Sequence, residues 1–187
     1  MIAFLFYFSV TYLAATFMMS GLGHALRFSH LTQALREHGI LSAGSAMPAA
    51  ALLTVFELMV AAFATRALVR SDIATIDFAV LGACSLAGTG FVLYLRRLLL
   101  TSKSSNCGCL PISAPLTSLS LAPAGAVAGV SAIGFACGFV LLQSAPYVLQ
   151  QLRPAEQWLP LAWGLILAGL VVLVPASMPQ PLTATRR

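Results

Sequence analysis

Two cysteines one residue apart stand in a short polar segment, Ser105-Asn106-Cys107-Gly108-Cys109-Leu110-Pro111, with strongly apolar sequence on both sides. A disulfide between Cys107 and Cys109 would close a very small ring, which makes it strained and comparatively oxidising. Strained or exposed disulfides are the labile ones that exchange with other thiols. Gly108 supplies the backbone freedom that such a ring needs. The spacing therefore predicts a reactive thiol–disulfide pair at the edge of an apolar domain.

Two other interpretations of this pair stay open. A metal site usually needs three or four protein ligands, and no His/Cys cluster stands near Cys107 and Cys109, so the sequence predicts no zinc-type site. Two thiolates alone suit Cu(I), which keeps a copper-carrier alternative. The pair could also be inert, although exposed thiols in a loop tend to oxidise.

The other two cysteines, Cys84 and Cys137, lie in the middle of apolar stretches. Free cysteine packs as a small hydrophobic residue, and that is the simpler interpretation of both. The functional alternative makes them a second redox pair within the membrane. That alternative requires their two helices to touch with the Cα atoms within about 7 Å of each other.

Glu57 lies close to the middle of a long apolar stretch. A charged carboxylate at the centre of a membrane helix costs roughly 2.5–3.5 kcal/mol on insertion scales. Such a group is therefore neutral, paired with a neighbour, or placed in a wet cavity. A proton relay, a contact to a bound polar ligand and a structural hydrogen bond are all compatible with it. The candidate partners are His24, Ser20 and Arg66.

The composition places these residues in a membrane. Of 187 residues, 59% are hydrophobic and only 8% are charged, against roughly 25% charged in soluble domains. Several apolar runs reach the length of about 20 residues that a helix needs to cross the bilayer. The net charge of +5 gathers at segment ends without a dense basic cluster, which argues against nucleic-acid binding. The first run has no basic leader and no clear cleavage site, so it is predicted to be a retained helix.

These features predict an all-α, integral-membrane helical bundle that forms a single transmembrane domain over residues 1–187. The expected transmembrane helices cover about 2–22, 46–69, 73–100, 122–148 and 157–174. The first of them is expected to end at the glycines 21 and 23, which are typical of a helix C-terminus. The Cys107–Cys109 pair falls in an irregular loop over about 101–121, and long irregular loops are often functional.

A shorter helix is expected over about residues 27–38. Apolar residues recur on one face, and polar and charged residues take the other, which is typical of an amphipathic helix lying on the membrane surface. The apolar positions are Phe28, Leu31, Ala34 and Leu35, and the polar positions are Arg27, His30, Gln33, Arg36, Glu37 and His38.

Two arguments about the sidedness of the loop disagree. Counting Lys and Arg at the segment ends favours an outside N-terminus and a cytoplasmic loop. A disulfide belongs on the oxidising side of a bacterial inner membrane instead. We place Cys107 and Cys109 on the periplasmic side, because their expected chemistry depends on the redox compartment.

Four segments together resemble the MauE family, the methylamine-utilisation membrane proteins related to the broader DoxX-like group. The resemblance covers about the first 110 residues. Its segments are Ser20-Gly21-Leu22-Gly23-His24, the amphipathic segment ending His38-Gly39-Ile40-Leu41, the Pro48…Glu57 stretch and Cys107-Gly108-Cys109.

The resemblance implies a role in maturing the small subunit of methylamine dehydrogenase, a disulfide-rich periplasmic protein, beside a thioredoxin-like partner. On this hypothesis Cys107 and Cys109 exchange disulfides with that periplasmic partner. Electrons would pass to or from a membrane quinone or the Cys84/Cys137 pair, and Glu57 and His24 would manage protons. The alternative is a non-catalytic membrane scaffold that docks a periplasmic partner on the 27–38 helix. A transporter is disfavoured, since neither broken helices nor inverted repeats are visible in the sequence.

Overall fold

The computed structural model describes residues 1–38, 42, 44–70, 75–100, 121–144, 160 and 162–168. Within these residues the chain is helical. The elements are α1 (Ile2–Leu26), α2 (Phe28–Glu37), α3 (Ala46–Arg70), α4 (Thr75–Leu100) and α5 (Leu121–Ser144), and residues 162–168 form a further helical segment. Four of these helices, α1, α3, α4 and α5, are long and apolar enough to cross a membrane. The expected all-α membrane bundle is therefore confirmed.

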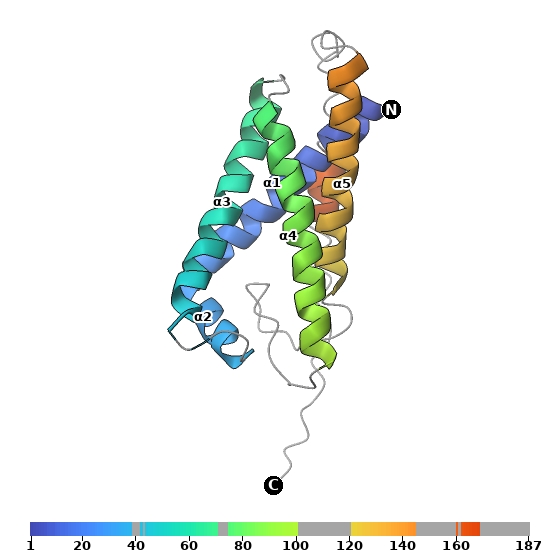
Figure 1. The fold of residues 1–187 in the computed structure, drawn as a ribbon. Helices are drawn as coiled ribbons and strands as arrows, with labels where there is room; N and C mark the ends of the chain where they lie inside the picture. The colour runs from blue at the N-terminus through green and yellow to red at the C-terminus, as the bar shows by residue number, and fades with distance from the viewer. Residues whose placement is uncertain are drawn as a thin grey trace.

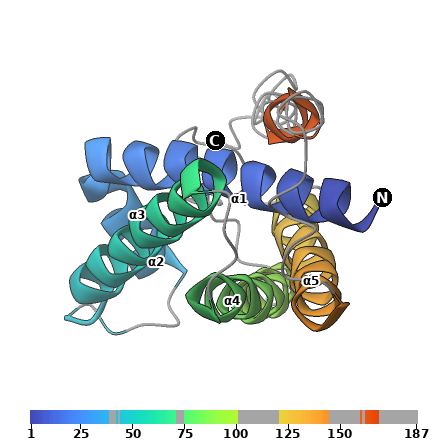
Figure 2. The ribbon, with the colours of Figure 1, turned by 90° about the horizontal axis from the view of Figure 1, so that it is seen from above.

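The first helix, α1, is the centre of the bundle. It runs obliquely to the more upright α3, α4 and α5 (Figure 1). In the view from above these three helices lie on one side of α1 and the 162–168 segment on the other (Figure 2). It packs extensively on α3 and α5, and it is the most buried of the four candidate spans. Its side chains form much of the main core, including Phe6, Val10, Leu13 and Phe17.

Close helix contacts depend on small residues. A methyl group added at Gly88 would lie 2.9 Å from the backbone nitrogen of Ala128, so α4 and α5 nearly touch there. A methyl group added at Gly134 would lie 2.7 Å from Cβ of Ser9, which brings α5 equally close to α1. Small residues allow such contact in lipid, where packing rather than the hydrophobic effect holds helices together.

One end of the bundle gathers α2 and the ends of two spanning helices. Leu95 and Leu98 near the end of α4 pack with Ala124 at the start of α5, and α2 lies at this same end (Figure 1). We call it the α2 end. The segment that carries Cys107 and Cys109 connects Leu100 to Leu121, both of which belong to this end, although the two cysteines themselves lie outside the described residues.

The structure changes two expectations about the N-terminal third. The helix α1 continues past the predicted end at residue 22 to Leu26, because Gly21 is used for helix packing rather than for termination. The helix α2 occupies nearly the predicted range, but its apolar face is not left to the lipid. Leu31 and Ala34 are buried and α2 packs against α3.

The last predicted span, about 157–174, is described only at residue 160 and over 162–168, where it is helical. A methyl group added at Gly164 would lie 2.9 Å from Cβ of Thr11, so this segment sits directly on α1. The remainder of that span, and the residues predicted to extend α5 to 148, lie outside the described residues.

Candidate functional site

Three polar side chains meet inside the membrane span between α1 and α3. The Ser20 hydroxyl donates a hydrogen bond to Oε1 of Glu57 at 2.8 Å. The Nδ1 atom of His24 lies 2.7 Å from Oε2 of the same carboxyl group. Both oxygens of Glu57 are therefore engaged by α1. We call these three residues the polar cluster.

The local sequence of α1 explains this geometry. Ser20 and His24 are four residues apart, so they project from the same face of the helix and can grip the two oxygens of one carboxyl group. Gly21 lies between them and lets α3 come close: a methyl group there would sit 2.9 Å from Cδ2 of Leu58 and 3.3 Å from Cβ of Glu57. The Ser-Gly-x-x-His spacing thus supplies two polar partners for Glu57, and its glycine allows the helix that carries Glu57 to come close.

His24 and Glu57 are shielded from solvent and lipid, and Ser20 is half-buried. His24 is 4% exposed and Glu57 is 6% exposed. A buried carboxylate without partners is strongly unfavourable, and here Ser20 and His24 of α1 contact both oxygens of Glu57. At 2.7 Å a proton lies between Nδ1 and Oε2, held by an imidazole, an imidazolium or a carboxylic acid depending on the charge state of the pair. The arrangement therefore places one proton between a carboxyl group and an imidazole.

Of the three partners proposed for Glu57 from the sequence, the structure brings two together with it. Ser20 and His24 are in contact with the carboxyl group. Arg66 is on the same helix but nine residues further along, about 13 Å away along the axis at 1.5 Å per residue. It is half-buried near the opposite end of α3.

A second buried histidine was not recognised from the sequence. His38 was placed on the polar, solvent-facing side of α2, but it is buried. Its Nδ1 lies 2.5 Å from the hydroxyl of Tyr94 on α4, and the two rings are 5.7 Å apart. The prediction was wrong because it grouped His38 with the polar positions by residue type. His38 keeps helical backbone angles, with its N–H bonded to the carbonyl of Ala34, and it lies seven residues after the buried Leu31, on the same face of the helix. The contact ties the end of α2 to α4.

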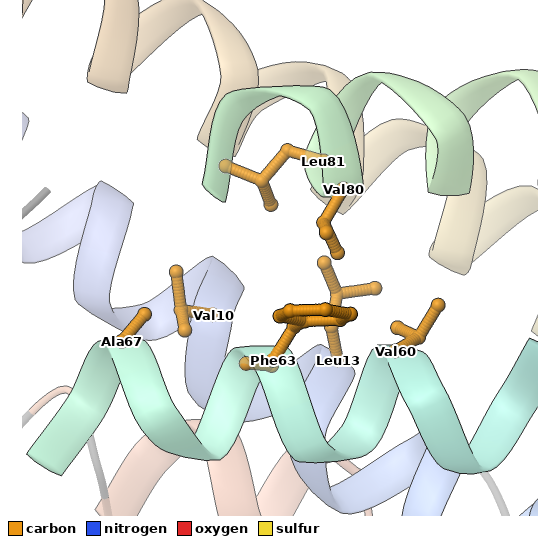
Figure 3. A pocket seen from close by; sticks show the side chains of 8 residues that line it. Val10, Leu13, Val60, Phe63, Ala67, Val80 and Leu81 are labelled. Atoms are coloured by element: carbon orange, nitrogen blue, oxygen red, sulfur yellow. The ribbon is translucent and has the colours of Figure 1, made fainter. Parts of the chain in front are cut away.

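An apolar crevice lies beyond the cluster towards the C-terminal end of α3. It is formed between α3 and α4, and α1 closes its base (Figure 3). All of its lining side chains are hydrocarbon, and none offers a hydrogen bond. They are Val10, Leu13, Val60, Phe63, Ala64, Ala67, Val80 and Leu81.

The two described cysteines are both free thiols. Cys84 is buried in the main core, and Cys137 packs partly buried against that core. The register of the antiparallel α4 and α5 separates them: Gly88 meets Ala128, so Cys84 lies level with about Ala132. That leaves Cys137 about five residues, or roughly 7 Å, further along the axis. A direct disulfide would require the helices to slide, and a second redox pair remains a prediction.

The catalytic pair predicted from the sequence, Cys107 and Cys109, lies outside the described residues. In the part of the chain that the structure does describe, no three side chains of His, Cys, Asp or Glu gather closely enough to hold a metal ion.

Comparison with known families bears on residues 2–144, a range that contains both the polar cluster and the cysteine segment. The family model described as methylamine utilisation protein MauE matches this range. The chain belongs to the MauE family. The match covers all four candidate membrane spans, so this member is a multi-pass membrane protein of methylamine utilisation. No match was found among curated proteins or among solved structures.

Proposed function

We propose that this MauE-family member is a membrane thiol–disulfide redox protein that assists the maturation of a periplasmic client. By the family's connection to methylamine utilisation, the client would be the small subunit of methylamine dehydrogenase, and the partner a thioredoxin-like protein. The bacterial inner membrane is the corresponding location, with the Cys107–Cys109 segment on its periplasmic side.

The observation that carries the proposal is the Cys107-Gly108-Cys109 sequence placed between two membrane-spanning helices. The described helices on its two sides end at Leu100 and begin at Leu121, both at the α2 end, which supports a position of the pair outside the bundle core. A thiolate of the partner would attack one sulfur of the Cys107–Cys109 disulfide, and a mixed disulfide would form. The partner's second thiolate would resolve it, which leaves two thiols on this chain and a disulfide on the partner, or the reverse.

The polar cluster supports the proposal by supplying a place for protons. Each disulfide that is made or reduced moves two electrons and two protons, and a membrane-embedded redox protein needs a group that accepts and returns protons. Glu57 and His24, joined through one proton at 2.7 Å, have the right chemistry for that role. A membrane quinone remains the proposed electron carrier.

The test is a replacement of Cys107 and Cys109 by serine, with Cys84→Ser and Cys137→Ser as matched controls. The double loop variant should lose disulfide formation in the client and should no longer trap a mixed disulfide with the partner. The controls should keep both activities if the buried thiols only pack. Full client maturation by the double variant would exclude the redox role and would favour the scaffold alternative, in which the exposed face of α2 docks the partner.

A further inference from the structure

Exposed arginines gather at the α2 end of the bundle. Arg27 stands between α1 and α2, and Arg36 lies in the last turn of α2. Arg96 and Arg97 lie near the end of α4. All four side chains are exposed, and Figure 1 shows that α2 and the last turns of α4 lie at the same end of the molecule. Positive charge from separate helices is therefore presented on one surface.

Nearby carboxylates do not cancel this charge. In the part of the chain that the structure describes, Arg36, Arg96 and Arg97 form no ion pair. The exposed carboxyl group that α2 itself carries is that of Glu37, which accepts a hydrogen bond from the side chain of Gln33 at 2.8 Å. Four arginines and one glutamate leave the described part of this surface with a net charge of +3.

The opposite end of α3 is balanced instead. Arg66 is half-buried there, and in the sequence Arg66 and Arg70 are followed closely by Asp72 and Asp77. Basic and acidic residues thus occur in equal number in this stretch. The excess of arginine is a property of the α2 end and not of both ends of the bundle.

Exposed hydrocarbon adjoins the arginines. Leu93, Arg97 and Leu100 are four and three residues apart, so they lie on one face of α4, and both leucines are exposed. Leu26, which directly precedes Arg27, is also exposed. A partner that covers this surface therefore meets guanidinium groups and hydrocarbon side by side.

The packing of α2 directs its charged face outwards. Leu31 and Ala34 are buried, because α2 packs against α3, and Arg36 on the other face is left for contacts outside the chain. The contact between His38 and Tyr94 joins α2 to α4, two residues after Arg36 and three residues before Arg97. The arginines of the two helices are therefore connected through a direct contact between those helices.

We propose that the α2 end binds anionic phospholipids, with Arg36, Arg96 and Arg97 on the phosphate groups and the exposed leucines against the acyl chains. Guanidinium groups match phosphate oxygens in a forked geometry, and basic residues close to a membrane surface attract anionic lipids. A soluble acidic protein would match the arginines but not the neighbouring Leu93 and Leu100. The proposal is independent of the thiol chemistry proposed above.

The experiment measures lipid selection by the full-length protein. Purified protein in a neutral detergent is mixed with phosphatidylglycerol and phosphatidylcholine that have identical acyl chains, and native mass spectrometry counts the molecules of each that stay bound. Each arginine near anionic lipid strengthens binding by about fivefold, so the unchanged protein should prefer phosphatidylglycerol by more than about tenfold. The preference should decrease as salt is added, because exposed charges are screened.

Substitutions identify the surface. Arg36→Gln, Arg96→Gln and Arg97→Gln should each lower the preference by up to about fivefold, and the three together should abolish it. Arg66→Gln, a matched change at the half-buried arginine towards the other end of α3, should leave it unchanged. Thermal unfolding in the same detergent shows that the variants are folded. A preference that survives the triple substitution, or that Arg66→Gln removes, overturns the proposal.

Two further probes separate a lipid from other anions. Inorganic phosphate at millimolar concentration should not displace phosphatidylglycerol, because it has no acyl chains to contact the leucines. Leu93→Ser with Leu100→Ser should weaken both lipids and keep their ratio. Displacement by phosphate would show that the surface binds free anions. Poly-glutamate that displaces the lipid, and whose binding is lost in the triple variant, would assign the surface to an acidic protein; either result overturns the proposal.

Discussion

The two halves of the α1–α3 contact use the same pair of helices for different purposes. Towards the α2 end, Ser20 and His24 grip Glu57 and the stability depends on matched polar atoms. Towards the other end, Leu13 and Val60 meet across hydrocarbon only, and the stability depends on volume. The boundary between the two halves is a single turn of each helix. Substitutions in the two halves can therefore be compared within the same pair of helices.

The largest expected effect is the loss of one partner of the buried pair. His24→Leu leaves the carboxyl group of Glu57 without its imidazole, and breaking a buried pair in this way typically costs about 3–5 kcal/mol. Replacing both residues, His24→Leu with Glu57→Leu, should recover much of that loss because no buried charge is left behind. Unfolding in mixed detergent micelles measures the difference. Equal instability of the single and double variants would show that the pair contributes packing rather than polar contacts.

In the apolar half, the cost of a change should follow its volume. Leu13 is 1% exposed, and Leu13→Ala should destabilise the protein by about 2–5 kcal/mol through the cavity that it leaves. Leu13→Met, which keeps the volume, should cost less than about 1.5 kcal/mol. The same unfolding measurement applies. A large effect of the methionine variant would mean that this half also depends on a specific contact.

Glycine 21 connects the two halves, and a methyl group there should separate them. Gly21→Ala drives a carbon into Leu58 and the stem of Glu57, and overpacking of this kind costs about 1–3 kcal/mol. The carboxylic C=O stretch of Glu57 in the infrared spectrum should also shift, since Ser20 and His24 both move relative to the carboxyl group. Gly125→Ala is the control: it is exposed with nothing within 4 Å, so it should be neutral or slightly stabilising, as expected when alanine replaces glycine in a helix.

The smallest expected effect concerns the contact between α2 and α4. Tyr94→Phe removes the hydroxyl that meets His38, and a single hydrogen bond contributes about 0.5–1.5 kcal/mol. Thr89→Val on the exposed side of the same helix should change stability by less than about 0.5 kcal/mol. Faster proteolysis near α2 in the Tyr94→Phe variant would confirm that this contact holds α2 in place, and no change in either variant would argue against it.

The sequence was sufficient for the features that depend on composition and period. Long apolar runs predict the spanning helices because few backbone structures other than a helix satisfy their hydrogen bonds in a membrane. A carboxyl group within such a run can be recognised as unusual without knowing how the helix is placed. It was insufficient to show that Ser20 and His24 meet Glu57, because that depends on which turn of α1 crosses α3. Arg66 is excluded by its spacing alone, since it follows Glu57 by nine residues on the same helix. Gly21 looked like a helix terminator for the same reason: its role depends on Leu58, which is far away in the sequence.

His38 shows a different limit. It was grouped with the polar positions by residue type, but it follows Ala34 by four residues, still with helical backbone angles, and is buried with it. Where residue type and helical period disagree, the period decides the face, because residues three, four and seven apart lie on the same side of a helix. The contact with Tyr94, 56 residues further along the chain, gave no local signal in the sequence.

The central place of α1 has a consequence for how the protein is made. This helix leaves the ribosome before α3 and α5, yet these are its main packing partners, and Glu57 follows His24 by 33 residues. During synthesis Ser20 and His24 therefore lack their partner, the carboxyl group of Glu57, until α3 has been made. Over that period α1 must stay in the insertion machinery or beside it. Release of α1 into lipid before α3 arrives would expose a histidine to hydrocarbon, so assembly should proceed by retaining the first helix until the second spanning helix has joined it.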